Sequence, residues 1–322
     1  MSLFSAPAAS VSIGGQAVME GVMIRNGDMY ALALRRADGA IVAERLPWFT
    51  LTRGWLKAPF LRGFPTLIET LVNGIKALSK SAVHSAEDEG EDIKGWHLAL
   101  TMIVSIGMAM LLFVAAPHLF SIGMQWLGLG GGVEGVTFHL WDGLFKFLIF
   151  VGYILAISCV PDIRRVFQYH GAEHKVIRAF ESGDEVSASA ACRFSRLHPR
   201  CGTTFLLFVL SLAIVLHTVT VPLLLHGWTP GNAAAKHGGI LIFKLLLMIP
   251  ISALAYELIR YAARIGDHFA GRTLRAPGML LQLLTTGEPD MQQLEVAVVS
   301  LAVALGPDAP STMNVPAYTR PE

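Results

Sequence analysis

Four long apolar stretches dominate the pattern of hydrophobic and polar positions along this chain. Each approaches the ~20 residues that an α-helix needs to cross the ~30 Å hydrocarbon core of a bilayer. We therefore predict an α-helical polytopic membrane protein with about four transmembrane helices in a membrane domain over residues 96–265. The apolar stretches cover residues 97–117, 141–160, 203–225 and 239–259.

The distribution of basic residues predicts the orientation of these helices. The segment 161–200 carries seven arginines and lysines, whereas 118–140 carries none and 226–238 carries only Lys236. Because cytoplasmic loops are enriched in these residues, we expect the central segment 161–200 and both termini to be cytosolic. The first residues also lack the basic start and apolar run of a secretory signal, so the N-terminal region is expected to stay on the same side.

A small cytosolic α+β domain is predicted before the first span, over residues 1–95. Alternating apolar positions in 29–36, a turn at Asp38-Gly39 and a second apolar run over 40–46 indicate a β-hairpin. The pattern then changes to apolar residues at every third or fourth position over 61–78, which indicates an amphipathic helix. Its apolar stripe either covers the hairpin or lies in the membrane interface.

Two further segments complete the predicted cytosolic part. The acidic run 87–92 is interpreted as a solvated linker into the first span, with a cation site as the alternative. In the C-terminal segment 266–322, Pro289-Asp290 has the character of a helix start. The short helix that follows is expected to dock on the cytosolic domain through Leu294, Val298 and Leu301.

Composition supports the membrane class and excludes others. Only 15% of the residues are charged, against roughly 25% in an average soluble domain. The net charge of +1 and the absence of a Lys/Arg-rich run argue against a nucleic-acid partner. An odd number of cysteines predicts reduced thiols rather than a disulfide framework; they are Cys159, Cys192 and Cys201.

Metal-ligand side chains concentrate in the central segment. His170, Glu173 and His174 match the H-x-x-E-H pattern of the inverted zincins, in which the histidines bind zinc and the glutamate transfers protons for a bound water. On a helix the two imidazoles stand one turn apart, roughly 5–6 Å between Cβ atoms, and can share one ion. His198 and Cys201 add an imidazole and a thiol just before the third span. We therefore predict a divalent-metal site, with zinc as the expected ion.

Two ligand sets are compatible with these residues. Three histidines and Cys201 would form a closed structural site, whereas His170 and His174 with Glu257, near the end of the last span, would leave one position open for a catalytic water. A carboxylate within a span is costly and usually has a partner. Without a metal, Glu257 would instead pair with a neighbouring arginine, and the histidines and cysteine would bind backbone carbonyls and water.

A glycine-containing run over residues 13–25 is the other conspicuous segment. It fits neither the P-loop nor the dinucleotide-binding fingerprint, so no nucleotide site is supported. Its paired glycines are more commonly a means of making tight turns. Glu20 and Arg25 are polar residues within apolar sequence and need partners, so they either pair with each other or face the central segment.

Four motifs resemble those of the YqhQ-type bacterial membrane protein family: GGQAVMEGVM, YHGAEHK, HPRCGT and LTTGEPD, within residues 12–305. That uncharacterised family is described as predicted metal-dependent enzymes, so the resemblance implies a multi-pass protein of the bacterial inner membrane with a metal. Gly287 departs from the family, which more often has arginine before Glu-Pro-Asp. The residues that fall on family motif positions are Glu20, His170, Glu173, His174, His198 and Cys201.

Three functional hypotheses follow. The leading one is a metal-dependent hydrolase in which Glu173 takes a proton from a metal-bound water. The alternative is a non-catalytic membrane anchor or assembly factor, whose structural metal supports docking of a cytosolic protein partner. A transporter is the weakest, because four spans would need an oligomer and, apart from Lys146 and Lys244, the spans offer no obvious ionisable relay. Each lysine lies near enough to a helix end to extend its ammonium group to the interface.

Overall fold

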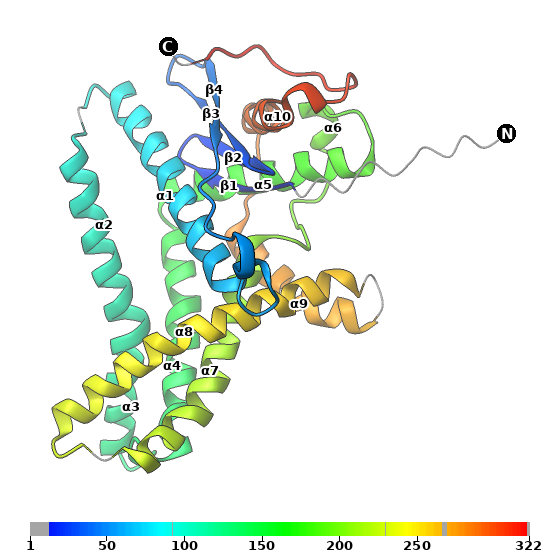
Figure 1. The fold of residues 1–322 in the computed structure, drawn as a ribbon. Helices are drawn as coiled ribbons and strands as arrows, with labels where there is room; N and C mark the ends of the chain where they lie inside the picture. Colours follow the sequence, from blue (N-terminus) through cyan, green and yellow to red (C-terminus); the bar gives the residue numbers. More distant parts are fainter. Residues whose placement is uncertain (1–12, 92, 229, 266–268, 321–322) are drawn as a thin grey trace.

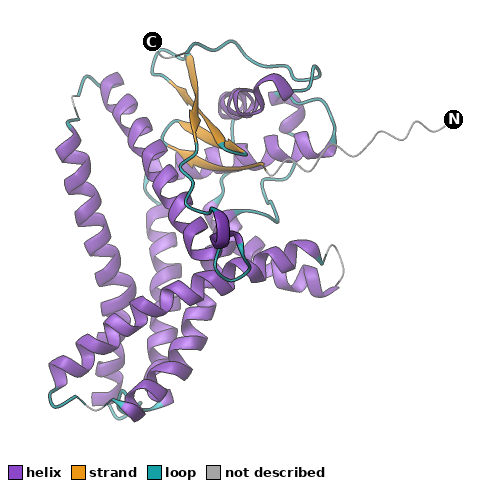
Figure 2. Cartoon of the chain, viewed as in Figure 1, coloured by secondary structure: helices purple, strands orange, loops and turns teal. Residues whose placement is uncertain are grey.

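The computed structural model describes residues 13–91, 93–228, 230–265 and 269–320. Its helices form a bundle at one end, and a small sheet with helices on both faces lies at the other (Figures 1 and 2). The first twelve residues, on which the expectation about a secretory signal depends, lie outside the described part.

Four of the described helical segments are long and apolar enough to cross a membrane, as the sequence predicts. The first is continuous through α2 (Gly95–Met110), the π-helical turn η2 (Leu111–Ala115) and α3 (Ala116–Trp126). The others are α4 (Val136–Ser158), α7 (Gly202–Gly227) and α8 (Ala233–Arg264).

The spans are packed unequally. The turn before α4 and helices α4, α7 and α8 share a buried cluster formed by Val133, Phe138, Val221, Leu225 and Ile240. In contrast, α2 has no buried residue and stands apart from the bundle in Figure 1. Lipid or another chain must therefore cover α2, because the side chains it exposes are almost all apolar.

The sheet is antiparallel with strand order β1-β2-β3-β4. The predicted hairpin is confirmed as β3 (Met29–Arg35) and β4 (Ile41–Pro47). The sequence analysis missed the preceding hairpin of β1 (Ile13–Val18) and β2 (Gly21–Asn26). The paired glycines of β1 lie in extended strand, so their interpretation as turn residues was wrong.

Both faces of the sheet are buried, which follows from the alternation of side chains along its strands. One face of β2, β3 and β4 packs against α5 (Pro161–Ser182) and α10 (Met291–Leu305). The opposite face packs against α1 (Gly63–Asp88) and Trp48. One core therefore joins three parts of the chain that the sequence separates: the N-terminal strands, the segment between the second and third spans, and the C-terminal helix.

The predicted helix after residue 289 is confirmed as α10. It forms part of the core of the sheet domain rather than lying on its surface. Asp290 and Gln293 form a capping box at the start of α10, and Leu294, Val298 and Leu301 are fully buried. The amphipathic helix α9 (Phe269–Thr285), which precedes it, was not predicted. Short connecting helices are η1 (Gly54–Lys57), α6 (Ala188–Ala191) and η3 (Gly306–Asp308).

The apolar stripe of α1 does not lie where one of the two interpretations of the sequence placed it, over the β-hairpin. Its buried positions are mainly small or polar, such as Glu69, Asn73 and Ala77, and these lie against the sheet and the loop after β4. Leu71 and Ile75 on the stripe are 49% and 42% exposed. The stripe therefore does not cover the hairpin, and the membrane-interface alternative fits better.

The acidic run after residue 86 is only partly a linker. Helix α1 extends through its first two residues, and Asp88 pairs with Arg36 at 2.6 Å and accepts a hydrogen bond from the Ala37 backbone at 2.9 Å. These contacts hold the end of α1 on the β3–β4 turn. Asp92 lies outside the described residues.

A close approach of two backbone segments joins α5 to the chain between α9 and α10. The Gly287 N–H donates a hydrogen bond of 2.6 Å to the Phe167 carbonyl, and a Cβ atom on Gly171 would collide with the Gly287 carbonyl. A Cβ atom on Gly287 would come within 2.8 Å of the Gln168 side chain. Glycine at both positions lets the segment reach α5.

Replacing Gly171 by alanine should lower the free energy of unfolding by about 1–3 kcal/mol, the usual cost of overpacking a close contact. Thermal or denaturant unfolding measures the change. Gly152→Ala on α4 is the matched control, because open space surrounds the position where its Cβ would lie. Equal unfolding midpoints for the two variants would contradict the close packing of α5 on the Gly287 segment.

Candidate metal centre

Helix α5 presents two histidines side by side at the end of the membrane bundle. Pro161 begins the helix and Gly183, in the left-handed region at φ 76°, ends it. One face of the helix is fixed by Tyr169 and its apolar neighbours in the sheet core. His170 and His174, four residues apart, lie outside this core with ring centroids 4.4 Å from each other.

The third candidate ligand comes from the start of α7. Cys201 is the N-cap residue of that helix, and its sulfur accepts a hydrogen bond from the Thr203 amide at 3.4 Å. Its Sγ atom lies 3.2 Å from Nε2 of His170. Among the described residues, the structure brings together one group of three metal-ligand side chains, His170, His174 and Cys201, with ligand atoms within 4.8 Å of one another.

Backbone carbonyls orient both imidazoles. Nδ1 of His170 lies 2.8 Å from the Thr285 carbonyl oxygen, and Nδ1 of His174 lies 2.5 Å from the Arg196 carbonyl oxygen. A carbonyl only accepts hydrogen bonds, so each Nδ1 carries the proton and each Nε2 presents a lone pair. Nε2 of His174 is buried without a hydrogen-bond partner among the described residues. This is the arrangement that metal-ligating histidines usually have.

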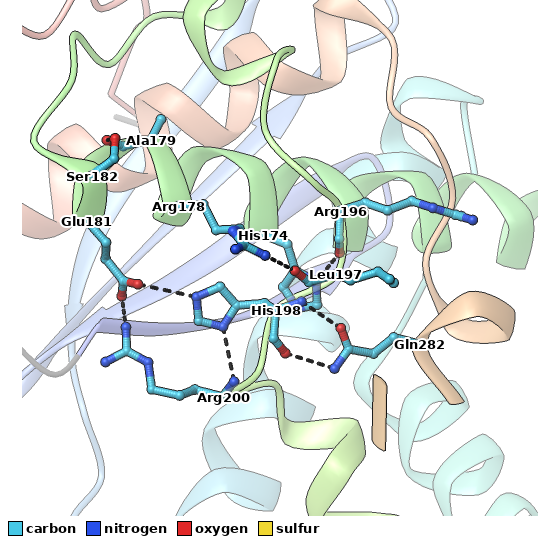
Figure 3. Close-up of polar contacts among 10 residues, drawn as sticks. All are labelled: His174, Arg178, Ala179, Glu181, Ser182, Arg196, Leu197, His198, Arg200 and Gln282. Atoms are coloured by element: carbon cyan, nitrogen blue, oxygen red, sulfur yellow. Dashed lines mark hydrogen bonds and ion pairs between the residues drawn. The ribbon is translucent and has the colours of Figure 1, made fainter. Parts of the chain in front are cut away.

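His198 lies beside His174 (Figure 3) but does not join the group of three. Its ring centroid is 5.5 Å from that of His174. Its Nδ1 accepts a hydrogen bond from the Arg200 amide, and its Nε2 lies 3.4 Å from the Glu181 carboxylate. Both ring nitrogens are therefore engaged, and the predicted closed set of three histidines and one cysteine is not assembled.

Glu257 also lies outside the group. Its two oxygens each accept a hydrogen bond of 2.7 Å from the Arg62 guanidinium, and one also accepts from the Phe60 amide. The prediction of Glu257 as a distal ligand is therefore wrong, because its carboxylate is committed to the start of α1. Among the described side chains, its ion-pair partner is Arg62.

Glu173 is buried next to the candidate ligands. Burial raises the pKa of its carboxyl, while His170, His198 and a hydrogen bond from the Gly15 backbone act in the opposite direction. Its Oε2 atom has no hydrogen-bond partner among the described residues. A Cβ atom on Gly15 would lie 2.7 Å from the Glu173 carboxyl carbon. The glycine of β1 thus leaves the space that the carboxylate occupies.

Burial also lowers the pKa of His174 and of His198, with smaller opposing contributions from the Cys201 side chain and from Glu173, respectively. Neutral imidazole is the form that binds a metal ion. The site therefore holds His174 in the protonation state that a metal requires at neutral pH.

Glu20 faces the central segment 161–200, which was one of the two arrangements expected from the sequence. It occupies the β1–β2 turn at a positive φ of 50°, which is uncommon for a non-glycine residue. Its carboxylate contacts the Arg165 guanidinium at 2.5 Å and Tyr169 at 3.2 Å. These contacts join the first hairpin to α5. Arg25 instead lies over the Trp48 ring at 4.1 Å, so it does not pair with Glu20.

The parts of the site that sequence reasoning missed are mostly backbone groups. No side-chain pattern marks the Thr285 and Arg196 carbonyls as partners of the imidazoles. Gln282 was also missed: it is fully buried and exchanges two hydrogen bonds of 2.8 Å with the backbone of His198. Gln282 stands within the apolar sequence of α9, and a polar side chain in such a position indicates a buried hydrogen-bonding role.

These observations define a mostly helical protein with four helices long and apolar enough to cross a membrane, a small antiparallel sheet domain and a His-His-Cys group where the two parts meet. Comparison with known proteins places it in a family. Residues 58–306 match the model of the family described as "Protein of unknown function (DUF1385)", and the chain belongs to that family. It is 33% identical over 320 residues to the uncharacterized protein YqhQ of Bacillus subtilis (strain 168), with 94% of each chain covered. No solved structure matches it.

Replacing Gln282 by leucine should lower the free energy of unfolding by about 1–3 kcal/mol for each His198 backbone group left without a partner. The exposed Gln292→Leu, whose side chain has no hydrogen-bond partner among the described residues, is the matched control and should change little. Denaturant unfolding of both variants measures the difference. Wild-type stability in Gln282→Leu would show that the loop before α7 does not depend on this amide.

Proposed function

We propose that this protein is a metal-dependent hydrolase of the bacterial inner membrane, with one zinc ion held by His170, His174 and Cys201. The observation that carries the proposal is the orientation of the two imidazoles. Their Nδ1 atoms face backbone carbonyls, and Nε2 of His170 lies 3.2 Å from the Cys201 sulfur. One ligand atom from each of the three residues lies within 4.8 Å of the others. Two nitrogen donors and one sulfur donor form a set that suits zinc.

Three protein ligands favour a catalytic over a structural site. Structural zinc sites are closed by four protein ligands, whereas catalytic sites keep one position for water or substrate. His198 and Glu257, the two residues that could have supplied a fourth ligand, are both engaged elsewhere. When bound, zinc would supply a water of lowered pKa and polarise a substrate carbonyl or phosphoryl group.

The chain's own contribution to hydrolysis would be proton transfer by Glu173. Its carboxyl is buried beside two imidazoles and keeps one oxygen free of hydrogen bonds among the described residues. The raised pKa brings this carboxyl closer to the neutral range in which a general base works best. Positioned acid–base groups of this kind contribute about 10²–10⁴-fold to rate.

The proposed location has the sheet domain and both termini in the cytosol. An even number of spans places both ends of the chain on the same side, and the basic residues of 161–200 are those expected on the cytosolic side. The metal centre would then lie where the cytosolic domain meets the inner leaflet. A substrate could approach it from the cytosol or from the membrane surface.

The alternative is a membrane anchor or assembly factor whose metal is structural. The exposed apolar stripe of α1, with Leu71 and Ile75, is the observation that favours it, because such a surface fits a protein partner as well as lipid. Leu294, Val298 and Leu301 of α10 would not take part in docking a partner, because these side chains are buried in the core of the sheet domain.

Purified wild-type protein should contain one zinc ion per chain by elemental analysis, and a His170→Ala, His174→Ala double variant should contain none, because two of three ligands are lost. His226→Ala, an exposed histidine at the far end of α7, is the control and should retain the ion. A wild-type preparation without zinc or another transition metal, after zinc was supplied, would contradict the metal centre.

Glu173→Gln separates the hydrolase from the anchor. For the hydrolase, the variant should keep its zinc and fail to complement a deletion of the gene, because proton transfer is lost while the ligands remain. Glu185→Gln, at an exposed position just after the same helix, should complement. Full complementation by Glu173→Gln, together with loss of folding in Cys201→Ser, would instead support the anchor.

A further inference from the structure

The interior of the membrane bundle contains a second group of ionisable side chains, remote from the metal centre. Asp142 and Lys146 project from α4, His217 from α7 and Lys244 from α8, and their exposed fractions are 1%, 7%, 4% and 2%, respectively. The expectation that both lysines extend to the interface is therefore wrong. Ionisable residues inside spans are costly, and they usually mark a functional site.

Asp142 lies between the two lysines. Its Oδ2 atom is 3.2 Å from the ammonium nitrogen of Lys146, and its Oδ1 atom is 2.9 Å from that of Lys244. One carboxylate therefore serves two ammonium groups, and with both lysines charged the group carries a net charge of +1. Such a surplus charge in a low-dielectric interior costs several kcal/mol unless a counter-ion is present.

Hydrogen bonding shows the same imbalance. Each ammonium group has three N–H donors, and among the described residues the Asp142 carboxylate is the only acceptor that contacts either ammonium group. His217 lies within electrostatic range of both lysines, and neither of its ring nitrogens has a hydrogen-bond partner of standard geometry among the described residues. The group is therefore rich in donors and poor in acceptors.

The histidines that surround this group add no negative charge. His118 on α3 lies 2.9 Å from His237 on α8, and His139 on α4 lies 2.9 Å from the Val133 carbonyl. A water molecule could accept some of the free N–H groups, but it would leave the net charge unchanged. An anion would satisfy both the donors and the charge.

We propose that the membrane domain binds one small monovalent anion among Lys146, Lys244 and His217, with chloride as the simplest occupant. His217 stands about 22 Å along α7 from Gly202, at 1.5 Å per residue, so this site is separate from the metal centre at the end of that helix. The anion joins α4, α7 and α8 deep in the bundle.

The test is thermal unfolding of purified full-length protein in detergent, with chloride replacing gluconate at constant ionic strength. Chloride and bromide should raise the unfolding midpoint in a saturable way, because a ligand that binds only the folded state stabilises it by mass action. An unfolding midpoint that is the same in chloride and in gluconate would overturn the proposal and indicate an uncharged lysine in the centre.

Variants of two of the charged groups, Lys244 and Asp142, give opposite expected results. Lys244→Met leaves one ammonium for one carboxylate, so it should fold, be at least as stable as wild type in gluconate, and weaken chloride binding by about 30-fold or more. Asp142→Asn raises the net charge and should tighten chloride binding. Lys236→Met, a surface lysine near the start of α8 that pairs with Glu134, should behave as wild type.

Crystallography of the wild-type protein tests the anion site even if the variants do not fold. Bromide-soaked crystals should show an anomalous scattering peak beside the Lys244 ammonium group. No bromide there, or a chloride response that Lys244→Met leaves unchanged, would overturn the site.

Discussion

Two hydrogen bonds to backbone carbonyls determine the chemistry of the candidate metal centre. The Thr285 and Arg196 carbonyls each accept a hydrogen bond from Nδ1 of a histidine on α5. This leaves both Nε2 atoms with a free lone pair, and that of His170 lies 3.2 Å from the Cys201 sulfur. Without these carbonyls the same side chains would be two solvated histidines and a free thiol. The rest of the sheet domain acts to hold the carbonyls in place.

That support comes from segments distant in sequence. Gly171 and Gly287 allow the chain after α9 to lie directly on α5, and Gln282 fixes the backbone of His198 in the loop before α7. From the other side, the β1–β2 turn holds α5 through the contacts of Glu20 with Arg165 and Tyr169. The segment between the second and third spans is therefore the central helix of a domain assembled from three parts of the chain.

Much of the architecture could be predicted from the sequence because its signals are local. Span length, the alternation of β3 and β4, and the cap of α10 each depend on neighbouring residues. The first hairpin was missed because its glycines interrupt the alternation, and the stripe of α1 was misassigned because periodicity shows which residues share a face but not what covers it. The prediction also failed for Glu257, since nothing local relates it to Arg62, 195 residues away.

The candidate site was predictable only where its residues are close in sequence. His170 and His174 share a helical face by spacing alone, whereas the choice of Cys201 over His198 depends on how the loop before α7 folds. The buried lysines show a further limit: distance from a helix end indicated that they reach the interface, but the position of Asp142 between them keeps both in the bundle. Ion pairing between helices decides whether a lysine within a span is buried or reaches the interface, and a single sequence does not show which residues pair.

The coordination of the zinc-loaded protein tests the central claim most directly. Extended X-ray absorption fine structure at the zinc edge should show two imidazole nitrogens at about 2.0–2.1 Å, one sulfur at about 2.3 Å and one further light atom. The Cys201→Ser variant should lose the sulfur contribution alone. A spectrum without sulfur, or one with several sulfurs, would contradict the proposed ligand set of His170, His174 and Cys201.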